Sequence, residues 1–223
     1  ISISFKKKGD LDSAIKYLKQ AIQINDKYPE ALFNLGNTLK EIGNNEEAIK
    51  YYLKARELKP QFAELHYNLS NAYFEIDQYK LSKASVLDAL KCKPNYHEAH
   101  NNLGVLLQAE CKLDKAIKSY KTAIKISPNY HEAINNLGVI YQEKGLVDLA
   151  IKNYNDAISL KRDEAKYHSN LAHSLLFKGN YHEGLEEYEY RLLKSDIPLV
   201  HSFPKSDKFN STDLDLNKKY LVI

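Results

Sequence analysis

The stretch NYHEAHNNLGVLLQAECKLDKAIKSYKTAIKISPNYHEAINNLGVIYQ (Asn95–Gln142) contains the same five-residue motif twice. The motif Asn-Tyr-His-Glu-Ala begins at Asn95 and recurs at Asn129, an interval of 34 residues. Small and large apolar residues recur within the interval at helical spacing, which is typical of arrays of stacked helical units. The rest of the chain can be aligned on the same interval.

The alignment produces three columns of small residues. In the first, a leucine is followed by Gly, Ser or Ala, at Leu35-Gly36, Leu69-Ser70, Leu103-Gly104, Leu137-Gly138 and Leu171-Ala172. The other two columns are Ala14, Ala48, Ser82, Ala116, Ala150 and Gly184, and Ala21, Ala55, Ala89, Ala123 and Ala157. Closely crossing helices leave room only for small side chains, because overpacking costs about 1–3 kcal/mol. The sequence therefore predicts an all-α fold of antiparallel helix pairs, with Tyr52, Val86, Tyr120 and Tyr154 in the core.

Turn residues divide the array into units. Glycines separate the two helices of a unit at Gly9, Gly43, Gly145 and Gly179. In two other units Asp77 and Cys111 stand at this position. Prolines close the second helices at Pro60, Pro94 and Pro128. The array 1–194 is expected to contain a partial unit 1–28, units 29–62, 63–96, 97–130 and 131–164, and a degenerate unit 165–198 in which Arg191 interrupts the third small column.

This combination of Leu-Gly, two alanine columns and a closing proline resembles the tetratricopeptide repeat family. The resemblance covers residues 1 to about 194 and implies a right-handed superhelical solenoid. It also implies that the first helices line a concave groove, which is usually a protein-binding surface.

A column of asparagines marks the predicted groove. It consists of Asn34, Asn68, Asn102, Asn136 and Asn170, with Asn101 and Asn135 beside two of them. Carboxamides both donate and accept hydrogen bonds, so the column could hold the backbone of an extended peptide. Phe33 and Tyr67 would be apolar anchors, and Asn37, Asn71 and His173 secondary polar contacts. The alternative interpretation is that these asparagines bond within or between helices.

The column resembles the asparagine ladder in the repeat arm of the eukaryotic O-linked N-acetylglucosamine transferase, which implies a role in holding substrate peptides. A second column, Glu30, Glu64, Glu98 and Glu132, predicts an acidic rim. Such a rim would repel the C-terminal carboxylate that some repeat domains of this family clamp.

Composition narrows the classes of partner. A net charge of +3 with 27% charged residues gives no electrostatic case for nucleic acid. The recurring Lys16, Lys50, Lys118 and Lys152 are interpreted as a solvated outer ridge, with an anionic partner as the alternative. No apolar run has membrane length, and Cys92 and Cys111 are expected as unpaired thiols in a reducing, cytoplasmic setting.

The histidine column His66, His100 and His168 is expected to pack as neutral imidazoles. The histidines have no carboxylate or cysteine at the spacing that a metal site requires, and the sequence contains no recognisable catalytic motif. No metal, cofactor or catalytic residue is therefore predicted.

The end of the sequence changes character. Residues 195–219 are polar, which predicts a linker, and residues 220–223 are predicted to be the first strand of a following domain. The two segments together are expected to form a non-helical C-terminal tail. The sequence begins at Ile1, in phase with the middle of a first helix, so the array is expected to be entered partway through a unit.

The junction resembles that of bacterial proteins in which such repeats precede a heptosyltransferase-like glycosyltransferase domain. The residues that carry this resemblance are Gly179-Asn180-Tyr181, Glu183-Gly184, Tyr188-Glu189-Tyr190-Arg191, Phe203-Pro204 and Leu221-Val222-Ile223. Three functions therefore stay open: a peptide-binding module, the substrate-recruiting arm of a glycosyltransferase, and a scaffold that assembles through its exposed ends.

Overall fold

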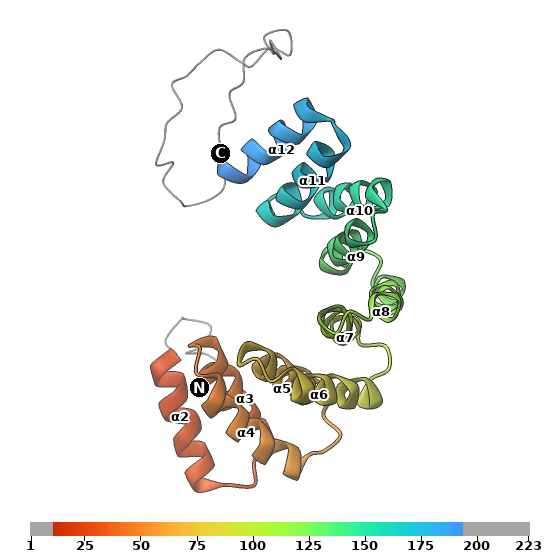
Figure 1. Cartoon of the computed structure of the whole chain (residues 1–223). Coiled ribbons are helices and arrows are strands. Elements are labelled where there is room, and N and C mark those ends of the chain that lie inside the picture. The colour runs from red at the N-terminus through yellow and green to blue at the C-terminus, as the bar shows by residue number, and fades with distance from the viewer. Residues whose placement is uncertain (1–10, 194–223) are drawn as a thin grey trace. The chain divides into compact units, whose positions relative to one another are not determined.

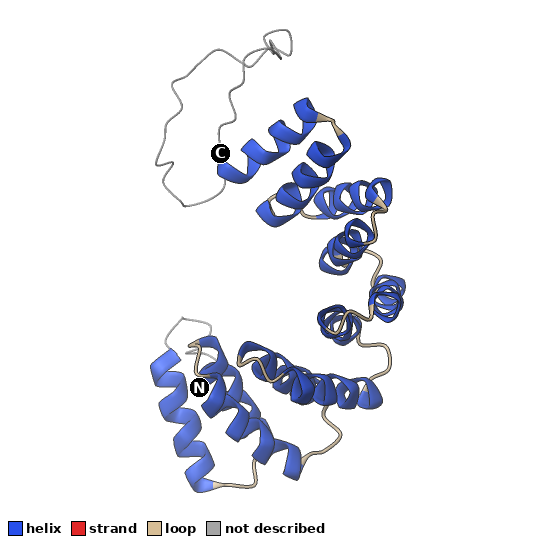
Figure 2. Ribbon diagram, viewed as in Figure 1, coloured by secondary structure: helices blue, strands red, loops and turns tan. Residues whose placement is uncertain are grey.

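The computed structural model describes residues 11–193, with side chains up to Tyr190, and every regular element within this range is an α-helix (Figures 1 and 2). The helices are α2 (Leu11–Ile24), α3 (Pro29–Glu41), α4 (Asn45–Leu58), α5 (Ala63–Glu75), α6 (Tyr79–Cys92), α7 (His97–Ala109), α8 (Leu113–Ile126), α9 (His131–Glu143), α10 (Val147–Leu160), α11 (Ala165–Lys178) and α12 (Tyr181–Leu193). The all-α prediction is confirmed. The expected helix remnant around Ile1, Gly9, the linker and the terminal strand lie outside the described residues.

Two compact units make up the chain, and the division falls between Ala133 and Ile134, inside α9. The first unit contains α2–α8, and the second contains α10–α12 with most of α9. Within each unit, helices that follow one another in the sequence pack against each other, as the pairs α3·α4, α5·α6, α7·α8 and α11·α12 do. First helices of neighbouring repeats also meet, because α3 contacts α5 directly.

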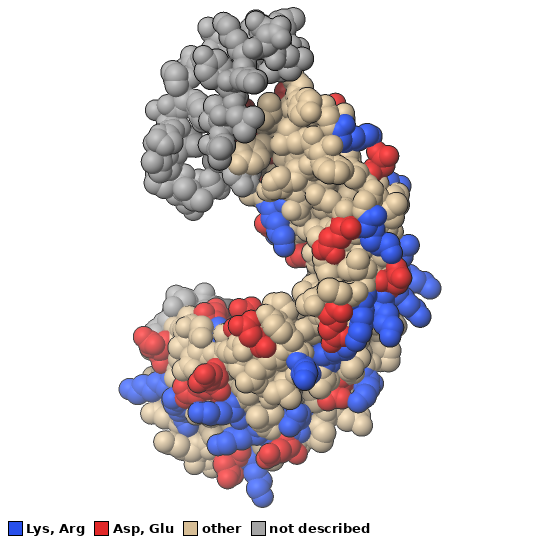
Figure 3. Space-filling model, viewed as in Figure 1, with Lys and Arg blue, Asp and Glu red and all other residues tan. Residues whose placement is uncertain are grey.

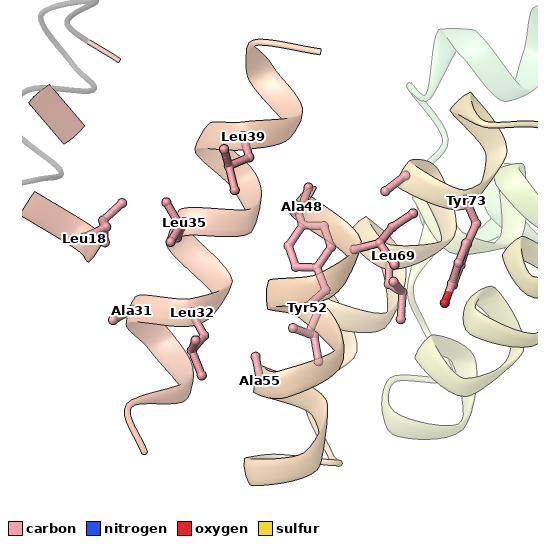
Figure 4. Close-up of a cluster of buried hydrophobic side chains, with 13 residues drawn as sticks. Leu18, Ala31, Leu32, Leu35, Leu39, Ala48, Tyr52, Ala55, Leu69 and Tyr73 are labelled. Atoms are coloured by element: carbon pink, nitrogen blue, oxygen red, sulfur yellow. The ribbon is translucent and has the colours of Figure 1, made fainter. Parts of the chain in front are cut away.

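A tyrosine fills the crossing point of three helix pairs. Tyr52 of α4 is fully buried, and a Cβ added at Gly36 of α3 would lie 2.5 Å from its ring. The same close approach joins Gly104 to Tyr120 and Gly138 to Tyr154. Figure 4 shows the ring of Tyr52 between Leu35 of α3 and Leu69 of α5. At these three positions an aromatic ring explains the glycine of the first small column, and the predicted core positions Tyr52, Val86, Tyr120 and Tyr154 are confirmed.

The turn within each helix pair has one recurring form. After α3, Gly43 takes φ +82°, and the Asn44 N–H donates to the Leu39 carbonyl at 2.9 Å. This Schellman arrangement satisfies carbonyls that the helix end leaves open. Asp77 adopts the same left-handed conformation after α5, with φ 58°, although it has a side chain. The turn geometry therefore belongs to the repeat and does not depend on glycine.

Candidate functional site

The asparagine column lies on the first helices α3, α5, α7, α9 and α11. All five of its members are half-buried, and each precedes the leucine of the Leu-small pair. The neighbouring Asn101 and Asn135 are more deeply buried, with exposed fractions of 7% and 1%. The column is therefore neither a freely solvated row nor part of the apolar core.

In the first unit the asparagines of successive first helices bond to one another. Asn68 Nδ2 donates to Asn37 Oδ1 at 2.8 Å, and Asn102 Nδ2 donates to Asn71 Oδ1 at 2.5 Å. We call these two pairs the asparagine rungs. The core tyrosine supports the first rung, because the Tyr52 hydroxyl donates to Asn37 Oδ1 at 2.8 Å. The rungs correspond to the second interpretation of the sequence pattern, in which asparagines bond between helices.

Each rung still has hydrogen-bonding atoms to offer. Asn37 Oδ1 accepts two bonds and so uses both of its lone pairs, while its Nδ2 hydrogens have no acceptor among the described residues. Asn68 uses one Nδ2 hydrogen, and its Oδ1 accepts no bond from the same part of the chain. One rung therefore presents a donor and an acceptor whose positions are already fixed by the bond between them. Asn34 lies at the start of the column, and its side chain makes no hydrogen bond within the described residues.

The second unit builds its polar network differently. Asn170 Nδ2 donates to Asn135 Oδ1 at 2.9 Å, and Asn135 Nδ2 lies 3.5 Å from Asn136 Oδ1. Val139 and His173 stand where the rungs have Asn37 and Asn71, and His173 is exposed. Gln142 accepts from the Tyr154 hydroxyl at 2.9 Å and from Ser174 at 3.1 Å. The uniform column of the sequence thus takes part in two different networks.

The two predicted apolar anchors are half-buried members of aromatic pairs. The Phe33 ring lies 4.7 Å from the Phe62 ring, and the Tyr67 ring lies 5.1 Å from the Tyr96 ring, measured between centroids. Phe62 and Tyr96 are the last residues of their units and directly precede the next first helix, so each anchor packs against the end of its own unit. The anchors are therefore held in place by the aromatic residue that ends their own repeat.

The predicted acidic rim is partly neutralised. Glu30 is paired with Lys59 at 2.8 Å, and this hydrogen bond lowers the pKa of the Glu30 carboxyl. Glu64 lies 4.0 Å from Lys93. The same lysines sit over the aromatic rings of Phe62 and Tyr96, at 4.8 Å and 4.3 Å from the centroids. Glu98 and Glu132 have no lysine partner in residues 11–193 and instead lie beside His97 and His131, at 3.0 Å and 3.1 Å.

The histidine column has a structural role that the sequence analysis missed. Nε2 lies 2.7 Å from the Pro60 carbonyl in His66, 2.9 Å from the Pro94 carbonyl in His100, and 2.7 Å from the Arg162 carbonyl in His168. A carbonyl can only accept, so Nε2 carries the hydrogen in all three. The signal was available as a histidine six residues after the position that closes the preceding second helix, which Pro60, Pro94 and Arg162 occupy. Between residues 11 and 193, no group of three histidine, cysteine or carboxylate side chains is arranged to hold a metal ion.

Comparisons with known proteins agree with this architecture. A family model described as TPR repeat matches residues 4–43, 36–77 and 112–145, and one described as Tetratricopeptide repeat matches residues 63–96 and 131–164. The crystal structure of MamA is 32% identical, with a TM-score of 0.67, over 75% of this chain and 98% of that chain. The chain belongs to the tetratricopeptide repeat family.

More distant tetratricopeptide repeat proteins share the fold. The thermophilic TPR protein TTC0263 of Thermus thermophilus is 22% identical, with a TM-score of 0.64, over 78% of this chain and 95% of that chain. YrrB, described as a TPR protein with an unusual peptide-binding site, is 22% identical, with a TM-score of 0.61, over 80% of this chain and 92% of that chain. Curated protein sequences contain no match. None of the helices in residues 11–193 is long and apolar enough to cross a membrane.

Proposed function

We propose that this tetratricopeptide repeat chain is a protein-interaction module that holds an extended peptide against its first helices. The observation that carries the proposal is the pair of asparagine rungs on α3, α5 and α7. Each rung fixes a free carboxamide donor beside a free carboxamide acceptor. An extended peptide presents the same two groups, a backbone N–H and a backbone C=O, at every residue other than proline.

The repeat spacing suits such a ligand. Packed helices lie about 8–10 Å apart, and an extended chain advances about 3.3 Å per residue. A peptide that runs across α3, α5 and α7 would therefore meet one rung about every three residues. Because the rungs are bonded before a ligand arrives, little side-chain freedom is lost on binding.

Selectivity for the side chains of the peptide would come from the aromatic residues beside the rungs. Phe33 and Tyr67 are half-buried and held by Phe62 and Tyr96, so their exposed portions offer apolar contact to a peptide side chain. The description of YrrB as a peptide-binding TPR protein supports the same kind of ligand. The carboxylates of the rim favour peptides without a cluster of acidic residues. A cytoplasmic location stays a prediction from the cysteine usage.

The experiment screens about a hundred unstructured peptides of varied sequence for binding to the chain and measures the tightest by calorimetry. Asn68→Ala and Asn102→Ala together should weaken its affinity about tenfold, because each removes neutral hydrogen bonds. The matched control is Asn129→Ala, which lies in an exposed turn of the same unit. N-methylation of the peptide backbone should weaken binding to a similar extent.

Two results would contradict the proposal. One is unchanged affinity for the double variant when circular dichroism shows that its helices are intact. The other is full binding of the N-methylated peptide, which would mean that only side chains are recognised.

A second candidate is the substrate-recruiting arm of a glycosyltransferase. It rests on the sequence of residues 179–223, which resembles the junction to such a domain, and on the resemblance of the asparagine column to a substrate-holding ladder. The intact mass and C-terminal sequence of the parent protein test it first. A following glycine-containing loop with alternating strands and helices would justify a sugar-transfer assay with a peptide acceptor. A continuation without that pattern would remove this candidate and leave the peptide-binding module.

A further inference from the structure

The outward faces of α8 and α12 carry opposite charges at equivalent positions of the repeat. On α8 the stripe consists of Lys115, Lys118, Lys121 and Lys125, and on α12 the residues that align with its first three members are Glu183, Glu186 and Glu189. We call these the lysine stripe and the glutamate stripe. The same positions of α2, α4, α6 and α10 hold mixed residues: Ser13, Lys16, Lys19 and Gln23; Glu47, Lys50, Leu53 and Glu57; Leu81, Ala84, Leu87 and Lys91; and Leu149, Lys152, Asn155 and Ser159.

The lysine stripe has no acidic partner among the described residues. All four of its side chains are exposed, and Figure 3 shows basic side chains gathered over α8. Glu110, in the turn before α8, is already bound by Lys83 and Lys112, each at 2.7 Å from its Oε2. Four like charges on one face repel one another, at spacings of three and four residues, unless an anion lies beside them.

The glutamate stripe is also exposed and only weakly engaged. Glu186 lies 3.8 Å from His182, and Glu183 lies 3.5 Å from Asn180. Glu189 has no partner within the described residues. By contrast, Glu187 points to the other side of the helix and is bound to His168 at 2.5 Å, so it does not belong to the stripe.

We propose that the lysine stripe of one chain binds the glutamate stripe of a second copy of the same chain. The first three lysines and the three glutamates share one spacing of three residues, or about 4.5 Å along a helix. Two such helices laid side by side can therefore bring all three charges of each stripe opposite an unlike charge. The stripes lie on second helices, so this contact leaves the asparagine rungs on the first helices available and is independent of peptide binding.

A second copy fits better than a nucleic acid or an anionic membrane. Either of those would need only the lysines, whereas the chain also carries their complement at the equivalent repeat positions. The contact would be heterologous, because each copy contributes a different stripe to each of its two contacts. Association would consequently continue beyond a dimer unless a ring closes.

Sedimentation velocity of the whole chain over a range of concentrations tests the proposal. In about 20 mM NaCl the sedimentation coefficient should rise with concentration, and in about 300 mM NaCl the association constant should fall about tenfold, because exposed ion pairs are weak and screened by salt. A chain that stays monomeric at every concentration in low salt would overturn the proposal, even if it bound a DNA oligonucleotide or an anionic vesicle.

Charge exchange provides the sharper test. Lys115→Glu, Lys118→Glu and Lys121→Glu in one variant, and Glu183→Lys, Glu186→Lys and Glu189→Lys in another, should each abolish self-association, because both stripes of each variant then have the same sign. Mixing the two variants should restore it. The control, Lys50→Glu with Lys54→Glu on α4, should associate like the original chain. Association in either variant alone, or none in the mixture, would overturn the proposal, provided that circular dichroism shows both variants folded.

Discussion

The repeats 29–62 and 63–96 form the same helix pair but fill its crossing point in different ways. In the first, Gly36 leaves space that the ring of Tyr52 occupies. In the second, Ser70 and Val86 stand at these positions, and the Ser70 hydroxyl lies 3.0 Å from that of Ser82, where the first repeat has Ala48. The side chains at both crossings, Tyr52 in the first repeat and Ser70, Ser82 and Val86 in the second, are buried. Both repeats therefore close the crossing with buried side chains, and several of these side chains differ together between the two repeats.

The largest difference between the two repeats should appear when the large side chain is removed. Tyr52→Ala deletes a fully buried ring, and we expect the free energy of unfolding to fall by about 3–5 kcal/mol. Val86→Ala removes much less volume and should cost about 2 kcal/mol. Urea unfolding followed by circular dichroism measures both values. Tyr51→Ala, next to Tyr52 but only half-buried, is the control, and equal losses for Tyr51 and Tyr52 would contradict this account.

Adding a methyl group at the crossing tests the coupling between positions. Gly36→Ala places a Cβ 2.5 Å from Tyr52 Cε1, so it should lower the free energy of unfolding by about 1–3 kcal/mol. The same change made in a Tyr52→Val background should cost little, because that background imitates the second repeat. A double-mutant cycle from urea unfolding gives the coupling energy. Additive effects would show that the two positions do not share one space.

Removing one hydroxyl of the second repeat should cost more than removing two. Ser82→Ala leaves the buried Ser70 hydroxyl without its partner, and the expected loss in the free energy of unfolding is about 1–2 kcal/mol. The double variant, Ser70→Ala with Ser82→Ala, approaches the first repeat and should be close to the original stability. A double variant as unstable as the sum of the two single variants would mean that each serine acts alone.

The smallest effect concerns the exposed ion pairs that link the repeats to their neighbours. Lys19 pairs with Glu47 of the first repeat at 3.3 Å, whereas Lys83 of the second binds Glu110 together with Lys112. The hydrogen bonds from Lys112 and Lys83 lower the pKa of Glu110 from 4.5 to about 2. Because this pKa is lowered, its stabilising contribution is present above pH 4.5 and is lost as the pH falls through about 2.

NMR titration of the Glu110 carboxyl carbon checks this last prediction. Replacing Lys83 and Lys112 by glutamine should bring the pKa of Glu110 back toward 4.5. Lys93→Gln, which changes a different exposed pair, should leave it unaltered. A Glu110 pKa that does not respond to either lysine would assign the shift to another cause.

The sequence predicted the repeat but not its polar connections. Periodicity placed Leu35, Gly36 and Tyr52 correctly, because close packing restricts these positions to particular volumes. It also aligned the asparagines. It did not predict that Asn68 bonds to Asn37 of the preceding first helix, because a hydrogen bond depends on which side chain of a neighbouring helix lies within about 3 Å. The histidine bonds to Pro60 and Pro94 were missed for the same reason, since a column shows where a residue recurs and not what it touches.

Packing between consecutive helices also has consequences for how this protein folds and unfolds. Among the described helices, the substantial contacts join helices that are consecutive in the sequence. A smaller contact joins α3 to α5, which are separated by one helix. Chains dominated by such local contacts fold quickly, and folding can start in any repeat and spread to the next. Amide hydrogens of α5, which has α4 and α6 packed against it, should consequently be among the slowest in the described array to exchange with solvent.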